Sequence, residues 1–450
     1  MQYFYKKAKY LCTKIRKTSL HPMSRILILL SFVIALVCLP LDAQTGLEFY
    51  LQQAVENSPF LLELHHRQEK NTVEAERLKS LYTRSTIGLT GESVMVPIIT
   101  QDNGKTSFKL DAQNADKYWG YDLAQSSSYL HAGITWNQPL TGGAFLKTEQ
   151  ARLKIENQQS ANDIRLHAHD LEKSVTDEYL LCLLDKTQMQ FADTIYNLLS
   201  HQYDVLYRLA TKGLAKNSDL ALLKIEQKNN ESLQQSALES FRNHLADLYI
   251  ICGIRDTILR NPTDLHLSLK IKSQEESPFT EKYRLDSLHT LSLLKSSLLP
   301  YRPKINVFID GGVYAGNYNQ LYRRMGMSAG ITFSWLLYDG KQKTMMERET
   351  ALDLSSISNY RQRFLLQKEQ EKQKYLTELR NQEKQQKILK EQLHAYDALL
   401  DNYCRELQQG NISMVDYITI LRNKIQVTKD SMLLETNTQL VINALNYWNW

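Results

Sequence analysis

The sequence predicts a mainly α-helical protein with a smaller β component, built as a tandem duplication of one unit: a helix, a strand pair and a long helical hairpin. Three observations predict this fold class. The stretch from Gly340 to Trp450 contains no proline and only one further glycine, Gly410. A matching stretch occurs earlier in the chain, and a constant offset separates the corresponding residues of the two stretches. Segments in which apolar and small polar residues alternate precede both copies.

The stretch after Gly340 predicts two long helices that fold back on each other at Gly410. Lys, Glu, Gln, Leu and Ala, which favour helices, dominate its composition. The first helix would have about 70 residues and a length of roughly 100 Å. Its second half carries an apolar heptad stripe that keeps one seam against a neighbouring helix. The stripe consists of Leu389, Leu393, Tyr396, Leu400, Tyr403 and Leu407.

An offset of 197 residues superimposes this hairpin on an earlier copy. The matched positions are Gly340 with Gly143, Gly410 with Gly213, Asp416 with Asp219, and the heptad stripe with Ala192, Tyr196, Leu199, Tyr203, Leu206 and Ala210. A constant offset means that no insertion separates the two hairpins, which indicates duplication. The predicted domains are a signal peptide over 1–43, a first repeat over 44–254 that turns at Gly213, a linker over 255–276, and a second repeat over 277–450 that turns at Gly410.

The first 43 residues are predicted to be a signal peptide rather than part of the fold. Seven Lys and Arg residues precede the apolar run 26–39, and Leu41-Asp42-Ala43 is a plausible cleavage site. Met23 is an alternative start that would leave a shorter signal. Because this segment holds seven basic residues but one acidic residue, the remaining chain is close to neutral. Nucleic-acid binding therefore loses its support from composition.

The remaining elements follow from composition and periodicity. In chain order they are a helix over 47–83, strands near 86–96 and 130–136, the first hairpin with its returning helix over 217–252, a helix over 279–299, strands near 304–313 and 326–337, and the second hairpin with its returning helix over 413–449. The connection between the first two strands, Ile98 to Ser128, is long and polar, whereas Tyr314 to Arg324 is short. Cys182, Cys252 and Cys404 are predicted to be packed helix residues, because their spacing suits neither a metal site nor a set of disulfides.

The second strand of each pair alternates in a way that suits a membrane. From Met327 to Leu337 most alternate residues are apolar, whereas the residues between them are small or polar, and Leu130 to Trp136 repeats this pattern. An apolar outer face and a small polar inner face are typical of transmembrane barrel strands. A half-buried hairpin in a soluble protein has the same period, so the strands alone leave both interpretations open. Because four strands cannot close a useful barrel, the chain is expected to oligomerise and so satisfy its sheet edges.

With its elements in this order, the sequence resembles the TolC family of outer-membrane efflux proteins across essentially the whole mature chain. Three local motifs are similar to the family's entry into the long helix and to its two periplasmic turns. They are Trp136-Asn137-Gln138-Pro139-Leu140 through Gly143, then Gly213-Leu214-Ala215 followed by Asp219, and Gly410 followed by Asp416.

The resemblance implies a homotrimer in the outer membrane. Three chains would share a transmembrane β-barrel of twelve strands, and their helices would form an α-helical tunnel across the periplasm. Gly213, Leu214, Ala215 and Gly410 would form the turns that dock to a periplasmic adaptor (membrane fusion) protein, which would join the duct to an inner-membrane pump.

The resemblance also implies a channel gate at the helical tip. Asp416 would supply a ring of aspartates that attracts cations, and Asp219 would lie near the contacts of the closed tip. Some members have a second luminal aspartate where this chain has Thr419. A tyrosine and an arginine that tie the closed tip in such members correspond to Leu407 and Ile412, which leaves open whether polar bonds or apolar packing close it. Asp416 also has a purely structural interpretation, as a carboxylate that begins a helix.

Enzymatic function is not predicted. The sequence has no HExxH, no GxxxxGK and no CxxC, and no cofactor or metal site is expected. The pairs His65-His66 and His167/His169 diverge around their helices, so we expect solvated side chains. Two hypotheses remain: a passive exit duct of a tripartite efflux or type I secretion system, and a non-transporting periplasmic coiled-coil adaptor or structural protein. The duplicated strand pairs favour the duct.

Overall fold

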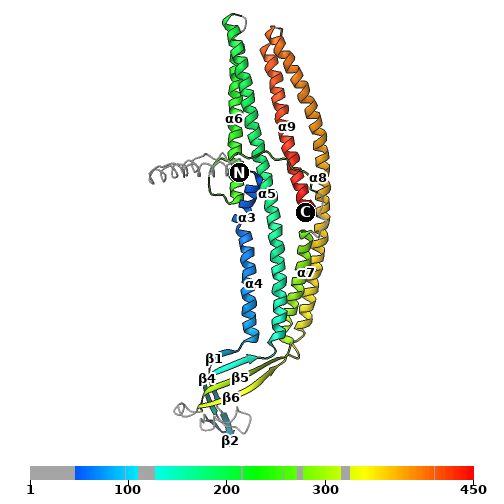
Figure 1. Ribbon diagram of the computed structural model, residues 1–450. Helices are drawn as coiled ribbons and strands as arrows, with labels where there is room; N and C mark the ends of the chain where they lie inside the picture. Colours follow the sequence, from blue (N-terminus) through cyan, green and yellow to red (C-terminus); the bar gives the residue numbers. More distant parts are fainter. Residues whose placement is uncertain are drawn as a thin grey trace, which may run out of the picture.

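The computed structural model describes residues 46–96, 98–109, 127–213, 216–256, 258–270, 277–315, 325–409 and 411–450. The protein is elongated, with a sheet at one end and two helical hairpins that reach the other end (Figure 1). The predicted signal peptide over 1–43 lies outside the described residues.

The two hairpins repeat each other element by element. In the first, α5 (Gly142–Thr211) is followed by α6 (Asn217–Cys252); in the second, α8 (Gln342–Gln408) is followed by α9 (Met414–Asn449). When α9 is moved back by 197 residues, both its ends fall on those of α6, and the end of α8 falls on that of α5. The predicted duplication is therefore present in the fold.

In each hairpin the returning helix is too short to cover the whole length of the long helix. α5 has 70 residues, whereas α6 has 36, so the half of α5 nearer the sheet packs against other helices. These are α3 (Leu47–Asn57), α4 (Pro59–Thr83) and α7 (Pro278–Ser297). α7 also packs against α8 and runs into the short 3₁₀ helix η1 (Leu299–Tyr301).

The prediction of one continuous helix over 47–83 is wrong, because the chain breaks at Ser58. Pro59 begins α4, since proline lacks the N–H that a helix interior needs but suits the first turn. The Ser58 hydroxyl caps the new helix by accepting a hydrogen bond from the backbone N of Leu61 at 3.4 Å. Pro278 begins α7 in the same way, after Ser277.

Four antiparallel strands form the sheet, in the order β1-β4-β5-β6. They are β1 (Thr86–Val96), β4 (Ser127–Pro139), β5 (Lys304–Ala315) and β6 (Met325–Ser334). The pairing of β4 with β5 joins the first repeat to the second. Within this sheet β1 and β6 are the edge strands. β6 ends at Ser334, so the predicted continuation of the strand to Leu337 is wrong.

The long connection after β1 contains a hairpin that the sequence analysis did not predict. β2 (Ile98–Asp102) pairs with β3 (Lys105–Lys109) around Asn103 and Gly104. Both turn residues have positive φ, 51° and 75°. An Asn-Gly pair between two short strands is the usual sequence of such a turn, so this signal was available and was overlooked.

Buried apolar side chains gather in separate clusters along the helices. The largest lies where α3, α5 and α6 meet and includes Tyr50, Tyr179, Leu248, Cys182 and Cys252. Both of these cysteines are fully buried, and Cys404 is partly buried on α8, as predicted. No helix in the described ranges has both the length and the apolar character needed to cross a membrane.

Candidate functional site

Two turns close the hairpins at the end of the molecule opposite the sheet (Figure 1). Gly213 follows α5 and has φ +75°, a left-handed conformation that glycine adopts without the steric cost of a Cβ. Its backbone N donates to the carbonyl O of Ala210 at 2.9 Å, which ends the helix. The other predicted docking residues, Leu214, Ala215 and Gly410, lie outside the described residues.

The two predicted gate aspartates begin the two returning helices. Asp416 is exposed in the first turn of α9, and its Oδ2 accepts a hydrogen bond from the Ser413 hydroxyl at 2.6 Å. The backbone N of Asp416 donates in turn to Ser413 Oγ at 3.2 Å. Asp219 takes the corresponding place in α6 and is partly buried. Asp416 therefore does stabilise the start of α9. Its side chain is nevertheless exposed at the tip.

An apolar cluster, called the tip cluster below, joins the two hairpins near their turns. Its buried members are Ile195, Leu199 and Leu206 of α5, Leu223 of α6, Leu400 of α8, and Met414, Tyr417, Ile418 and Leu421 of α9. The second half of the predicted heptad stripe, Leu400, Tyr403 and Leu407, packs here. Leu407 and Ile412 both contribute apolar contacts. Burial raises the pKa of Tyr417 to about 12.

Charged pairs also connect the helices below the tip, and the sequence analysis missed them. Arg422 of α9 forms an ion pair with Glu226 of α6, whose side chain is buried. The hydrogen bond from Arg422 to Glu226 raises the pKa of the arginine. Lys424 Nζ lies 2.5 Å from Asp397 Oδ1 of α8. These residues fit no motif spacing, and only the packing of the helices brings them together.

One face of the sheet is apolar and exposed across all four strands. Strand register and alternation place on it Ile87, Leu89, Ala132, Ile134, Trp136, Ile305, Val307, Ile309, Val313, Met325, Met327, Ala329, Ile331 and Phe333. Leu89 is 85% exposed and Met327 is 79% exposed. A continuous apolar face of this size needs an apolar neighbour. Of the strands predicted near 86–96 and 304–313, the second contributes four apolar residues to this face, whereas the first contributes Ile87 and Leu89 and continues with Gly91 and Ser93.

The opposite face, called the polar face below, carries small and polar residues. They are Thr86, Gly88, Thr90 and Glu92 of β1; His131, Gly133, Thr135 and Asn137 of β4; Lys304, Asn306, Asp310 and Gly312 of β5; and Gly326, Ser328, Gly330, Thr332 and Ser334 of β6. Phe308 of β5 also lies on this face, and its ring lies close over Gly330. The run Gly326–Gly330 matches the pattern GxSxG. It lies inside a strand rather than at a strand-to-helix turn, so it forms no nucleophile elbow.

His169 is buried, contrary to the prediction of a solvated side chain. Its ring stacks between Tyr447 and Trp450, with centroid distances of 4.8 and 4.0 Å. Its Nε2 donates to the carbonyl O of Tyr447 at 3.1 Å. Hydrogen bonds from His169 and Lys270 lower the pKa of Glu172 to about 2. The aromatic residues at 447–450 pack against the helix layer, as predicted.

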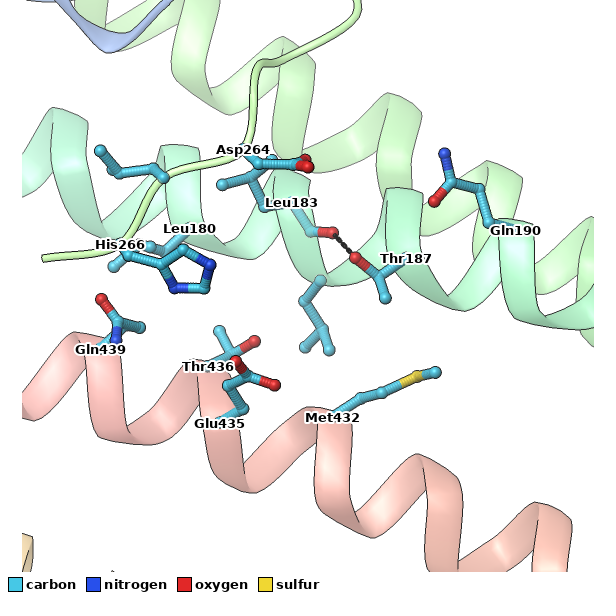
Figure 2. A pocket seen from close by; sticks show the side chains of 12 residues that line it. Leu180, Leu183, Thr187, Gln190, Asp264, His266, Met432, Glu435, Thr436 and Gln439 are labelled. Carbon is cyan, nitrogen blue, oxygen red and sulfur yellow. Dashed lines mark hydrogen bonds between the residues drawn. The ribbon is translucent and has the colours of Figure 1, made fainter.

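The segment between the repeats crosses the helices beside a cavity of about 310 Å³ between α5 and α9 (Figure 2). Leu180, Leu183 and Thr187 of α5 lie on one side, whereas Glu435 and Gln439 of α9 lie on the other. Gln439 Oε1 accepts a hydrogen bond from the backbone N of Leu267 at 2.6 Å. Lys186 Nζ donates to the carbonyl O of Pro262 at 2.7 Å. These bonds fasten the segment to both hairpins.

Among the described residues, no group of three or more His, Cys, Asp and Glu is arranged to hold a metal ion.

These features define the fold class, a duplicated helical hairpin with a small antiparallel sheet, and solved outer-membrane channels of the TolC family share it. The outer-membrane channel OprN is 11% identical, with 90% of this chain and 89% of that chain covered and a TM-score of 0.66. CusC is 11% identical, with 91% and 92% covered and a TM-score of 0.67. The open MtrE channel of Neisseria gonorrhoeae is 11% identical, with 90% and 88% covered and a TM-score of 0.63.

No family model matches the sequence, and no curated protein matches it. At 11% identity the likeness shows the fold alone. It confirms the fold of the single chain that the sequence resemblance implied, helical hairpins with a small antiparallel sheet.

Proposed function

We propose that the protein is a passive exit duct of a tripartite efflux or type I secretion system, located in the outer membrane and extending into the periplasm. The observation that carries this proposal is the sheet: one face is apolar and exposed, the other is polar, and it lies at the end of two long hairpins. Such a sheet suits lipid on one side and water on the other. The fold shared with outer-membrane channels supports the same function.

The edges of the sheet support a closed oligomer, and the family resemblance gives its number as three. Unpaired strand edges cannot lie in lipid, so β1 of one chain would pair with β6 of the next until the sheet closes. Three chains of four strands would give twelve strands, the number that the family resemblance implies. The helical hairpins would then surround a periplasmic tunnel.

The hairpin turns are proposed to form both the gate and the docking surface. Asp416, exposed at the start of α9, would supply the charged ring, and Asp219 would lie near the inter-helix contacts of the closed tip. Gly213, Leu214, Ala215 and Gly410 would meet a periplasmic adaptor protein, which connects the duct to an inner-membrane pump.

Conductance of the purified, detergent-extracted protein in a planar bilayer tests the duct. We expect discrete steps that prefer cations. Asp416→Asn should weaken the preference while keeping an oxygen for the Ser413 hydroxyl, and Asp430→Asn, in the middle of α9, is the matched control. Steps that Asp416→Asn leaves unaltered would contradict the gate assignment alone. A protein that stays soluble without detergent and conducts nothing would contradict the duct and favour the coiled-coil adaptor or structural protein.

A further inference from the structure

A cavity of about 300 Å³ lies where the sheet meets the helices of the first repeat. The end of α4, the starts of β1, α5 and β5, and the end of β4 together form its wall. Residues of the polar face line it, among them Lys304 and Asn306 of β5. The cavity therefore belongs to the polar side of the sheet, at the level where the strands pass into the helices.

Two cations line this cavity, and none of its lining residues is acidic. The cations are Arg84, between α4 and β1, and Lys304, at the start of β5. Both are exposed, and neither forms an ion pair within the described part of the chain. The first carboxylate along α5, Glu149, is already paired with Arg152, whose Nε lies 2.8 Å from Glu149 Oε2. Two cations on one wall without an acidic neighbour there favour an anion in the cavity.

The rest of the wall includes a substantial apolar part. The rings of Tyr82 and Phe145 stack with a centroid distance of 5.8 Å, and Phe145 is buried. Leu81 lines the cavity as well and is 50% exposed. Lys304 Nζ lies 5.9 Å from the centre of the Phe145 ring, so charge and apolar surface adjoin each other. A ligand that matches this wall has an apolar body beside its charged group.

The second repeat holds a carboxylate of its own at the equivalent place. α4 and α7 both begin at a proline, and the offset of 219 residues between Pro59 and Pro278 places Tyr301 on Tyr82. The offset of the hairpins, 197 residues, places Asp339 on Gly142.

Asp339 collects three hydrogen bonds at the start of α8. The Tyr301 hydroxyl donates to Asp339 Oδ2. The backbone N of Lys341 donates to Oδ1 at 2.9 Å, and that of Lys343 donates to Oδ2 at 2.7 Å. A carboxylate is therefore bound between the tyrosine and the helix start in the second repeat.

The first repeat keeps the tyrosine and the helix start but lacks the carboxylate. Gly142 leaves no room for a side chain, because a Cβ there would lie 1.5 Å from the carbonyl O of Tyr82. The first turn of α5 contains no acidic residue, and Thr141 does not cap it. The Thr141 hydroxyl instead accepts a hydrogen bond from the backbone N of Ile305 at 3.2 Å. An anion at this place must therefore come from outside the chain.

We propose that this cavity binds an organic anion, an aromatic carboxylate. Its carboxylate would take the place that Asp339 holds in the second repeat and interact with Arg84 and Lys304, and its ring would lie against Tyr82 and Phe145. Binding itself needs only the residues of this wall. That such an anion meets the site on its way through the duct rests on the proposed function, in which the polar face lines the pore.

Isothermal titration calorimetry of the protein in a non-ionic detergent tests the site, with 2-naphthoate as the probe in a buffer free of phosphate and of other carboxylates. We expect saturable binding that weakens as the KCl concentration rises, because salt screens charge pairs. The uncharged 2-naphthamide, which has nearly the same shape, should bind roughly tenfold more weakly or not at all, since charge-assisted hydrogen bonds are the stronger ones.

Substitutions of the two cations show whether the probe binds at this cavity. Arg84→Gln and Lys304→Gln should each weaken the binding of 2-naphthoate by roughly fivefold. Lys304→Arg keeps the charge and should retain most of the affinity. Arg302→Gln is the matched control, because Arg302 is an exposed cation at the corresponding junction of the second repeat and does not line the cavity. The melting temperature of each variant in detergent reports whether the fold is intact.

The outcomes separate this inference from the duct. Equal binding of 2-naphthamide, or 2-naphthoate binding that both glutamine variants leave unchanged, would overturn the anion site and leave the duct in place. In a planar bilayer, 2-naphthoate should reduce the current of the unaltered channel and have less effect on Lys304→Gln. Binding in detergent without any effect on the current would overturn the position of the site on the pore. A folded protein that binds the probe but conducts no ions would overturn the duct and leave the site.

Discussion

At the scale of single residues, the ends of the helices depend on a few close contacts. Gly253 ends α6 in a left-handed conformation, with φ 64°. Beside it, Asn57 Nδ2 donates to the carbonyl O of Cys252 at 2.9 Å. This bond satisfies one of the carbonyls that a helix end leaves unpaired, so α3 and α6 are fastened together where the first repeat ends.

Gly253→Ala is expected to destabilise the protein by about 1–2 kcal/mol, because a Cβ there is strained by the positive φ. It would also lie 2.7 Å from Asn57 Cβ. Gly143→Ala is the matched control, since a Cβ at Gly143 meets nothing within 4 Å. Chemical unfolding of both variants checks the prediction. Equal stability of the two variants would contradict it.

Glu172→Gln should lower the melting temperature at neutral pH, and the difference from the unaltered protein should fade as the solution becomes acidic. The pKa of Glu172 is lowered to about 2 by the hydrogen bond from His169 and by Lys270. A carboxylate with a lowered pKa stabilises the folded state above its ordinary pKa of about 4.5 and loses that effect as the pH falls toward 2. Because Glu172 is partly exposed, the loss at neutral pH should be on the order of 1 kcal/mol or less.

The measurement is the melting temperature at several pH values between 7 and 3. Glu391→Gln, at an exposed position of α8, is the control and should cause no change that depends on pH. A difference for Glu172→Gln that stays constant down to pH 3 would contradict the assigned cause.

At the scale of elements, the tip cluster holds the two hairpins of one chain together. Leu199 and Leu223 come from the first hairpin, and Leu400 and Ile418 come from the second. Leu407 and Ile412 occupy the two positions at which the sequence left open whether polar bonds or apolar packing close the tip. Both add apolar contacts to the tip cluster. Within the chain, apolar packing and the Glu226–Arg422 ion pair therefore both hold the tip together.

Leu199→Ala is expected to destabilise the tip by about 2–4 kcal/mol, because it leaves a cavity among buried side chains. Leu198→Ala is the matched control: Leu198 is the next residue on α5 but is 36% exposed, against 2% for Leu199. Hydrogen exchange resolved along the chain should show faster exchange in both α5 and α9 for Leu199→Ala. Faster exchange confined to α5 would mean that the cluster does not couple the hairpins.

At the scale of the whole molecule, the two faces of the sheet predict how the protein sits in its surroundings. Ile331 is 70% exposed on the apolar face of the edge strand β6, whereas Thr332 belongs to the polar face. In a sheet that faced water on both sides, a lysine at either position would cost little. In a sheet with lipid against the apolar face, the two positions differ sharply.

Ile331→Lys is therefore expected to cost about 2–4 kcal/mol in the assembled membrane form, as a lysine that faces lipid near the bilayer centre does. Thr332→Lys should cost much less. The yield of detergent-resistant oligomer from the membrane fraction measures both. Equal yields would contradict the proposed contact with lipid, and an oligomer of other than three chains would contradict the proposed trimer.

Much of the fold was predictable because local sequence patterns determine it. The constant offset without insertions predicted the repeat, and the absence of proline predicted the long helices. The alternation of apolar and polar residues predicted the strands. The break at Ser58 was missed because a proline in the first turn of a helix leaves the apolar periodicity on both sides intact. The β2–β3 hairpin was missed because its short strands lie inside a polar segment. The gate and docking assignments at Asp416, Asp219 and the turns stay predictions.

The sequence by itself determined which elements form and that they form twice, because helix and strand periodicity are local properties of the chain. Only the tertiary structure decided which distant residues meet. It pairs β4 with β5 across the two repeats, brings Arg422 to Glu226, buries His169 between two rings, and sets His131 against Asp310 over a pair of glycines. The physical reason is that such contacts depend on strand register and helix packing, which one-dimensional patterns do not encode.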